Sequence, residues 1–309
     1  MKEFHLTIDE LEADIKNGKS YLLVEPVHDS RMKLLIGTLK ILTEKDVKKL
    51  REIYAGHPNK IIRVYTTIPH YVEEEKRVSW VNSIISFFEK SPLFKNLSRE
   101  RKEFIVKYLK AVIREDDYVI WKVSQLKKFS DRVFEHTLNT CFIALAIYYS
   151  YTLSNHSGMI DGKAVENIIN ASLLHSIGIM KINPDFLKRK RWEICLEKNI
   201  EFFNHPVEAF KTIQSEASRH ELSDEVLQAI LDHEEFVDGT GMPRGILGTD
   251  MPFLAKLLSI SHYFELLLGG ELSIRERSYK ECFHKIVQEK GKFDPALIEA
   301  LKSSFIYLA

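Results

Sequence analysis

The stretch Ala171-Ser172-Leu173-Leu174-His175-Ser176-Ile177-Gly178 runs as an apolar helix that ends on a histidine and then meets a glycine. Further histidines lie at or near predicted helix ends in the same half of the chain: His136, His205 before Pro206, His233 within Asp232-His233-Glu234, and His262. Imidazoles and carboxylates that converge from several helices are the usual way to hold divalent metals in a bundle core. A single histidine is more often a cap or a surface group. The residues alone leave both interpretations open.

Helical periodicity extends outward from this stretch in both directions, beginning near residue 72. Val81, Ile84, Ile85 and Phe88 fall on one helix face, for example. The pattern predicts later helices over 131–151, 164–175, 206–216 and 224–234, and again from about Phe253. The glycine-rich stretch 238–248 predicts a loop.

The N-terminal seventy residues have a different pattern. Short β-prone runs at 21–24 and 33–36 flank a polar turn around His28, and 60–67 predicts a closing strand. Thr43 followed by Glu44 indicates a capped helix. We therefore expect an α+β protein with a small α/β domain (1–70), a helical connector (71–124) and an all-α bundle (125–309).

Composition excludes several classes of protein. The 309 residues carry 44 basic and 44 acidic side chains, so no net charge favours a nucleic-acid or membrane-surface partner. The longest apolar runs are too short for membrane insertion, and the first residues do not resemble a secretory signal. Three widely separated cysteines predict neither a disulfide framework nor a thiolate zinc site. A cytoplasmic location is the expectation.

The ordered motifs resemble the HD-GYP branch of the HD phosphohydrolase superfamily. The resemblance rests on His136, on 173–178, on His205-Pro206, on 232–234 and on Asp238-Gly239-Thr240-Gly241-Met242-Pro243. The segment Phe293-Asp294-Pro295 is similar to the one that closes such domains. The resemblance to the HD-GYP branch covers residues 125–309 and implies an all-α HD-GYP helical bundle. It also implies hydrolysis of cyclic di-GMP with two or three clustered metals, often iron or manganese. Such metals acidify water and neutralise phosphate charge.

Several positions depart from the family pattern. Ser176 stands where the family has an aspartate that bridges two metals, and a neutral hydroxyl is a poor substitute for that carboxylate. Ile179 replaces a lysine, Met242 replaces the tyrosine of Gly-Tyr-Pro, and Arg132 replaces a glutamate. Two further changes exchange ligand types, with Asp232 in place of histidine and His262 in place of a carboxylate. The catalytic residues are therefore unknown.

The resemblance implies two candidate metal groups. One is His136, His175 and His262, and the other is His205, Asp232 and His233. At least one divalent ion (Fe, Mn or Zn) is expected, although Asp232 is equally consistent with a solvated carboxylate and His262 with a core histidine. The loop Gly241-Met242-Pro243-Arg244 is the candidate ligand-binding segment. The basic run 188–191 is expected to form a solvated face.

The leading hypothesis is a degenerate HD-GYP protein of bacterial cyclic di-GMP signalling, weak or inactive as a phosphodiesterase, that acts by binding a ligand or a protein. One alternative is an active metal-dependent phosphodiesterase with rearranged ligands, and another is a protein-binding module similar to the HDOD group. Cyclic di-GMP or a related nucleotide, a diguanylate cyclase and a second copy of the chain are the expected partners. The aromatic residues Phe142, Tyr148, Tyr149 and Tyr151 predict core packing or a dimer surface.

Overall fold

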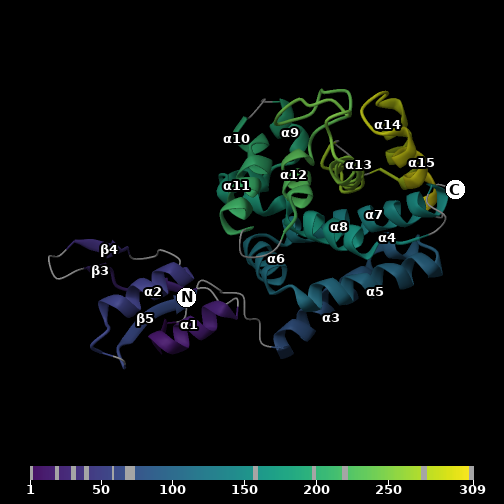
Figure 1. Cartoon of the computed structure of the whole chain (residues 1–309). Coiled ribbons are helices and arrows are strands. Elements are labelled where there is room, and N and C mark those ends of the chain that lie inside the picture. The colour runs from purple at the N-terminus through teal and green to yellow at the C-terminus, as the bar shows by residue number, and fades with distance from the viewer. Residues whose placement is uncertain are drawn as a thin grey trace. The chain divides into compact units, whose positions relative to one another are not determined.

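The chain divides into two compact units, 1–73 and 74–309, in a computed structural model (Figure 1). The structure describes residues 3–17, 21–28, 33–37, 42–57, 59–66, 74–155, 159–196, 200–217, 222–272 and 277–305. A small antiparallel sheet in the first unit and helices throughout the second confirm the expected α+β class.

The N-terminal unit is a three-stranded antiparallel sheet of order β1-β5-β2 with two helices and a separate hairpin. Its elements are β1 (Glu3–Thr7), α1 (Ile8–Lys16), β2 (Tyr21–Leu23), β3 (Val27–His28), β4 (Leu34–Ile36), α2 (Glu44–Ile53) and β5 (Ile61–Thr66). Thr43 caps α2 in a reciprocal capping box with Asp46, as the sequence predicts. The predicted strands correspond to β2, β4 and β5, whereas β1, α1 and β3 were not anticipated, and His28 ends β3 instead of lying in the predicted turn. Part of the predicted turn after His28 lies outside the described residues.

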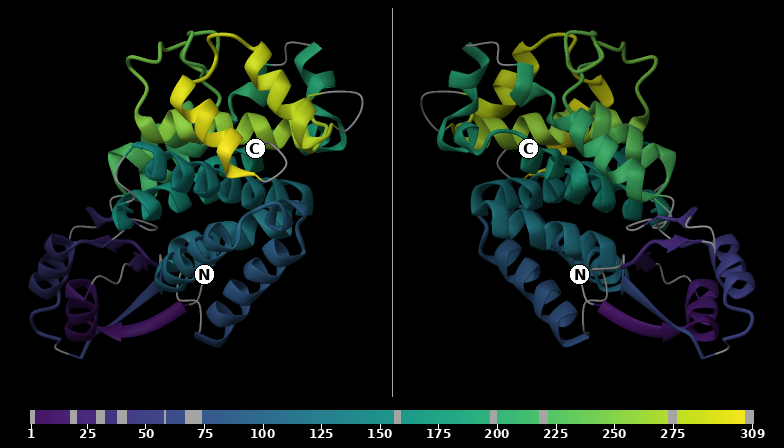
Figure 2. Two further views of the ribbon diagram at one scale, coloured as in Figure 1. Left: turned by 90° about the vertical axis from the view of Figure 1, so that its right-hand side faces the viewer. Right: turned by 90° about the vertical axis from the view of Figure 1, so that its left-hand side faces the viewer.

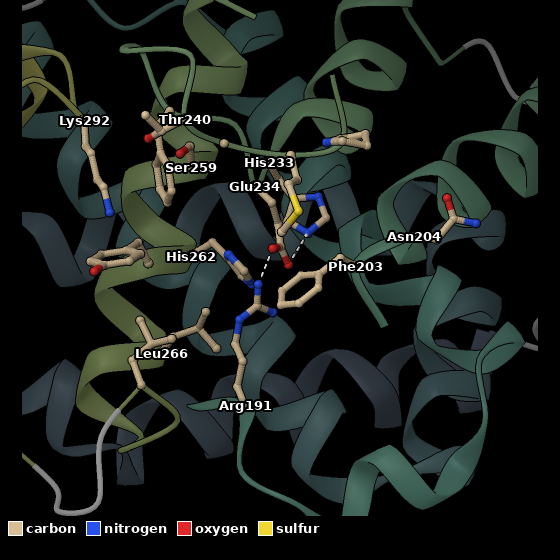
Figure 3. A pocket seen from close by; sticks show the side chains of 16 residues that line it. Arg191, Phe203, Asn204, His233, Glu234, Thr240, Ser259, His262, Leu266 and Lys292 are labelled. Carbon is tan, nitrogen blue, oxygen red and sulfur yellow. Dashed lines mark hydrogen bonds and ion pairs between the residues drawn. The ribbon is translucent and has the colours of Figure 1, made fainter. Parts of the chain in front are cut away.

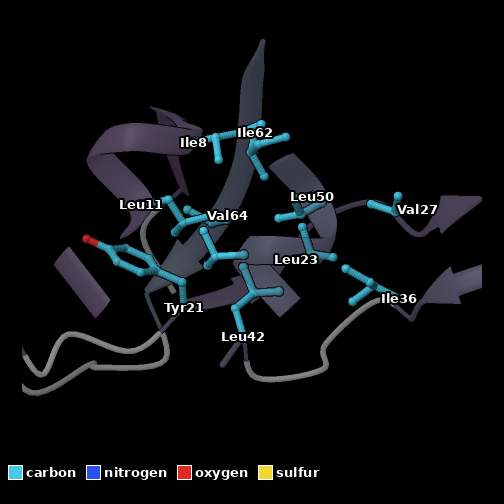
Figure 4. Packing of buried hydrophobic residues seen from close by; sticks show 11 residues of the cluster. Ile8, Leu11, Tyr21, Leu23, Val27, Ile36, Leu42, Leu50, Ile62 and Val64 are labelled. Atoms are coloured by element: carbon cyan, nitrogen blue, oxygen red, sulfur yellow. The ribbon is translucent and has the colours of Figure 1, made fainter. Parts of the chain in front are cut away.

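Burial of alternating strand residues against the two helices stabilises this unit. Leu23, Val64, Leu11 and Leu50 meet in a core from which water is excluded (Figure 4). β5 runs between the other two strands, with Phe4 opposite Val64 and Leu22 opposite Tyr65.

In the described residues of the second unit the secondary structure is helical, apart from an isolated bridge between Asp238 and Leu247. Its elements are α3 (Glu74–Lys90), α4 (Pro92–Lys95), α5 (Arg99–Glu115), α6 (Asp117–Phe129), α7 (Asp131–Asn155), α8 (Gly162–Leu174), the 3₁₀ turns η1 (His175–Lys181) and η2 (Pro184–Lys188), α9 (Arg191–Leu196), α10 (Ile200–Phe203), α11 (His205–Ala217), α12 (Asp224–Asp232), α13 (Phe253–Leu268), α14 (Tyr279–Gln288) and α15 (Pro295–Ser304). The predicted helices and the loop at 238–248 are present, with ends shifted by a few residues.

Helix α7 and helix α8 form the middle layer of this unit. In both views of Figure 2, α3 and α5 lie on one side of this pair and α13 and α15 lie on the other. The predicted connector helices thus pack within the same compact unit as the later helices. Phe142 on α7 is buried and stacks on Phe88 of α3, so this aromatic residue belongs to the core. No helix in the described part of the chain is both long and apolar enough to cross a bilayer.

A glycine permits the close approach that positions the site. At Gly178 in η1, an added Cβ would lie 1.9 Å from the His205 carbonyl oxygen and 2.5 Å from the Ala209 nitrogen. Only a residue without a side chain lets η1 pack this tightly on the start of α11. His175 and His205 are brought to the same region of the core as a result.

Candidate metal centre

Three buried histidines share one local geometry. The Nδ1 atoms of His175, His205 and His233 donate to backbone carbonyls three residues earlier, at 2.6 Å (Ser172), 2.9 Å (Phe202) and 2.7 Å (Ile230). A carbonyl can only accept, so each Nδ1 carries the proton and each Nε2 presents its lone pair, which on His175 accepts from the Ser176 hydroxyl. A position at the end or the start of a helix leaves those carbonyls available. The local turn therefore orients each ring as a neutral ligand.

These lone pairs point at one another. His136 Nε2 lies 3.2 Å from His175 Nε2, and His205 Nε2 lies 3.2 Å from His233 Nε2. The Nδ1 of His136 is hydrogen-bonded to the Glu265 carboxylate. Two imidazole nitrogens bound to one tetrahedral ion at about 2.0–2.1 Å lie roughly 3.3 Å apart. The spacing therefore fits a metal ion between the members of each pair.

A third donor completes each group. His262 joins His136 and His175, and the three ring centroids lie 5.0–5.3 Å apart. Glu234 joins His205 and His233, with its Oε1 atom 3.3 Å from His205 Nε2. That Oε1 atom is buried without a hydrogen-bond partner among the described residues.

Asp232 is not the carboxylate of the second group. It is fully buried, and both its oxygens are bound by Arg244, with Nε to Oδ1 at 3.0 Å and Nη2 to Oδ2 at 2.7 Å. Gln228 donates to the same carboxylate. Consecutive residues at a helix end point in different directions, so Glu234 faces the histidines while Asp232 faces Arg244. The expected set is corrected to His205, His233 and Glu234.

Burial keeps the histidines neutral. Removal from water, reinforced by neighbouring imidazoles, holds the pKa of His175 and His262 well below the usual value. Burial and then His205 lower the pKa of His233 to about 3. Burial alone would raise the pKa of the Glu234 carboxyl, but Arg191, His205 and His233 lower it to about 2. At neutral pH His175, His233 and His262 are therefore neutral and Glu234 is charged, which are the forms that bind metals.

Arg191 departs from the prediction that the basic run 188–191 is exposed to solvent. The run 188–191 was expected to be solvated, but the Arg191 side chain is only 10% exposed and forms an ion pair with Glu234. Its guanidinium also lies over the rings of Phe202 and Phe203, at 5.2 and 5.3 Å from their centroids. Arg132 binds Glu271 and the carbonyls of Leu187 and Arg189, and no ion pair with a member of either metal group is seen among the described residues.

Two cavities open beside the histidines. The larger, about 790 Å³, is lined by His233 and His262, by the 240–243 loop and by aromatic side chains including Phe203 and Tyr263 (Figure 3). The smaller, about 320 Å³, is lined by His136, His205 and His262 and by Glu265 and Ile179. Of the four loop residues expected to meet a ligand, Gly241, Met242 and Pro243 line the larger cavity, whereas Arg244 is bound to Asp232. An added Cβ at Gly241 would lie 2.3 Å from the Glu235 Cα, so a glycine is needed for the loop to pack there.

The helical unit matches a known family over its central part. The HD domain family matches residues 143–297, about half of the chain. The chain belongs to the HD domain family. The predicted membership of the HD superfamily is confirmed by this match, and the HD-GYP resemblance of the motifs agrees with the cyclic dinucleotide phosphodiesterases among the relatives of the chain.

Three known proteins show this similarity. The cyclic di-GMP phosphodiesterase PdeB of Borreliella burgdorferi is 26% identical over 54% of this chain and 41% of its own length. The 3'3'-cGAMP-specific phosphodiesterase 2 of Vibrio cholerae is 28% identical over 50% of this chain and 29% of its own. The structure of Bd1817, a HDG"Y"P protein from Bdellovibrio bacteriovorus, matches 97% of this chain and 98% of its own at 17% identity, with a TM-score of 0.46. The chain spans less than half the length of both phosphodiesterases.

Glu234, Glu265 and Arg191 were not among the predicted residues of this candidate site. Glu234 could have been predicted from the sequence, because it directly follows His233 in the motif Asp232-His233-Glu234. Glu265 lies three residues after His262, a spacing that puts both side chains on the same face of α13. Arg191 carried no such signal, since a run of four basic residues is typical of a solvated surface.

Proposed function

We propose that this HD domain protein acts in bacterial cyclic di-GMP signalling as a degenerate HD-GYP protein. It binds a divalent ion (Fe, Mn or Zn) at His136, His175 and His262 and a cyclic dinucleotide in the adjoining cavity, and it hydrolyses that ligand weakly or not at all. The paired Nε2 atoms support the metal, and the cyclic dinucleotide phosphodiesterases among its relatives support the ligand class.

The side chain of Ser176 carries the inference of weak hydrolysis. Its Oγ lies 2.8 Å from His175 Nε2, so the hydroxyl donates to the nitrogen that would bind the ion. A carboxylate at this position would supply negative charge and two oxygens, enough to join two metals. The hydroxyl supplies neither, and the two histidine groups are left without a shared ligand.

The residues around the ion have distinct tasks. A bound divalent ion supplies positive charge to a phosphate and acidifies water. Glu265 accepts from His136 Nδ1 and so orients that ring toward the ion. In the larger cavity, the apolar walls exclude water and suit the faces of nucleobases, while Arg191 and Lys292 supply cations for phosphates.

Metal content tests this proposal first. Protein purified without oxygen, chelators or a metal-affinity tag should hold a divalent ion by elemental mass spectrometry, and His175→Ala should lose it. His284→Ala, which changes an exposed histidine, is the matched control and should keep the ion. Calorimetry should then detect cyclic di-GMP binding, with little or no product in a turnover assay. Folded wild-type protein that holds neither metal nor nucleotide would contradict the proposal and favour the HDOD-like alternative.

An active phosphodiesterase is the second candidate. Glu234 favours it, because this carboxylate gives the His205–His233 pair an anionic ligand despite the loss at Ser176. Rapid hydrolysis of cyclic di-GMP by protein loaded with iron or manganese would select this candidate. Homodimerisation and a diguanylate-cyclase partner stay part of the proposal. Light scattering tests the first and a pull-down experiment tests the second. A cytoplasmic location is also part of the proposal.

A further inference from the structure

The two histidine groups differ in their charge. In the His136–His175–His262 group the neighbouring carboxylate is Glu265, which accepts from His136 and from Asn139. Within the described residues no lysine or arginine pairs with Glu265, so its negative charge is available to a cation. In the other group the carboxylate is Glu234, and its charge is already matched by Arg191.

Arg191 is held firmly in this position. Its guanidinium donates to Oε2 of Glu234, and Glu234 also faces His233 (Figure 3). The Oε1 atom of the same carboxylate lies 3.3 Å from His205 Nε2. The rings of Phe202 and Phe203 pack against the guanidinium, and the backbone nitrogen of Arg191 donates to Glu271 at 3.2 Å. A fixed cation on the far side of one carboxylate repels a second cation on its near side, and burial strengthens that repulsion.

We propose that Arg191 takes the place of a second metal ion. Its guanidinium neutralises Glu234 and keeps the His205–His233–Glu234 group free of metal, so that the protein holds a single ion at His136, His175 and His262. This inference rests on the proposed metal-binding function. Arg191 also lines both cavities, as do His262 and Leu266, so its cation faces any anionic ligand that enters either one.

Metal stoichiometry after substitution of Arg191 tests the inference. Arg191→Met keeps a side chain of similar length against the two phenylalanines but removes the charge. The full-length protein is equilibrated with excess Mn²⁺, passed through a desalting column and analysed for bound manganese. We expect one equivalent in the wild type and two in Arg191→Met. Adding Glu234→Gln to Arg191→Met should return the count to one.

Lys190→Met is the matched control. It removes the same charge from the neighbouring residue, whose ammonium pairs with Glu271 rather than with Glu234. It should bind one equivalent, like the wild type. Circular dichroism establishes that each variant is folded.

The possible outcomes separate this inference from the proposed function. Two equivalents in the wild type, or a second equivalent in Lys190→Met as well, would overturn the role of Arg191. So would one equivalent in a folded Arg191→Met. If the wild type binds none and Arg191→Met binds one, Arg191 does exclude metal, but the proposed ion at the first group is lost. If Arg191→Met does not fold, the manganese content of the wild type still tests the inference, because two equivalents would overturn it.

Discussion

At the scale of single residues, orientation decides which side chains belong to the site. Asp232, His233 and Glu234 are consecutive, yet Asp232 is bound by Arg244 while the other two face His205. The Nδ1–carbonyl bonds of His175, His205 and His233 fix their tautomers before any ion arrives. This preorganisation lowers the entropic cost of metal binding.

The buried histidines predict a pH dependence of stability in the metal-free protein. In the unfolded chain a histidine titrates near pH 6.5. In the folded chain the pKa values of His175, His205, His233 and His262 lie lower, chiefly because burial disfavours the charged form. Below about pH 6.5 the unfolded chain binds more protons, so the free energy of unfolding falls as the pH drops. Each histidine contributes up to about 1.4 kcal/mol per pH unit.

Urea denaturation in the presence of a chelator between pH 7.5 and pH 5 measures this slope. His233→Gln should make the slope shallower, because one group that titrates only after unfolding is gone. His284→Gln, at an exposed position, should leave it as in the wild type. A wild-type slope of zero would show that these histidines are not neutralised by burial.

At the scale of elements, close packing of η1 on α11 brings the two histidine groups together. Gly178 is the point of contact, where a Cβ would overlap the backbone of α11. The 240–243 loop follows the same principle, because Gly241 lies directly on the backbone at Glu235 and Phe236. Both glycines are needed for a close approach between two segments of backbone.

Gly178→Ala should therefore damage both stability and metal binding. The added methyl group must move η1 away from α11, and overpacking of this kind costs on the order of 3 kcal/mol. His175 moves with η1, so the bound ion should be lost as well. Gly162→Ala is the control, since a Cβ there meets nothing within 4 Å and should change stability by less than about 1 kcal/mol. Urea denaturation and elemental analysis of both variants check this, and retention of metal and stability in Gly178→Ala would contradict it.

At the scale of the whole molecule, the two units have separate hydrophobic cores. Leu50 belongs to the core of the N-terminal unit, and both histidine groups belong to the helical unit. A ligand that binds only the folded form of a unit stabilises that unit, by about 2.7 kcal/mol at a hundred times its Kd. The two units should therefore respond to different perturbations.

Differential scanning calorimetry of the full chain tests this separation. Mn²⁺ should raise the melting temperature of the transition that belongs to the helical unit and leave the other in place. Leu50→Ala should lower the other transition, since a cavity at a fully buried leucine costs about 2–5 kcal/mol. One common transition that responds to both changes would contradict independent units.

The sequence by itself determined the class of the fold, the main helices of the C-terminal half and the histidines of the site. Those features depend on local periodicity, on caps such as Thr43 and on motifs whose residues lie close together along the chain. Only the tertiary structure decided that Glu234 rather than Asp232 joins the histidines, that Arg191 is buried beside it, and that Arg132 binds Glu271. Segments that are distant in sequence decide where a side chain at a helix end points and which partner a buried charge finds. The periodicity of the sequence does not show which distant segments meet.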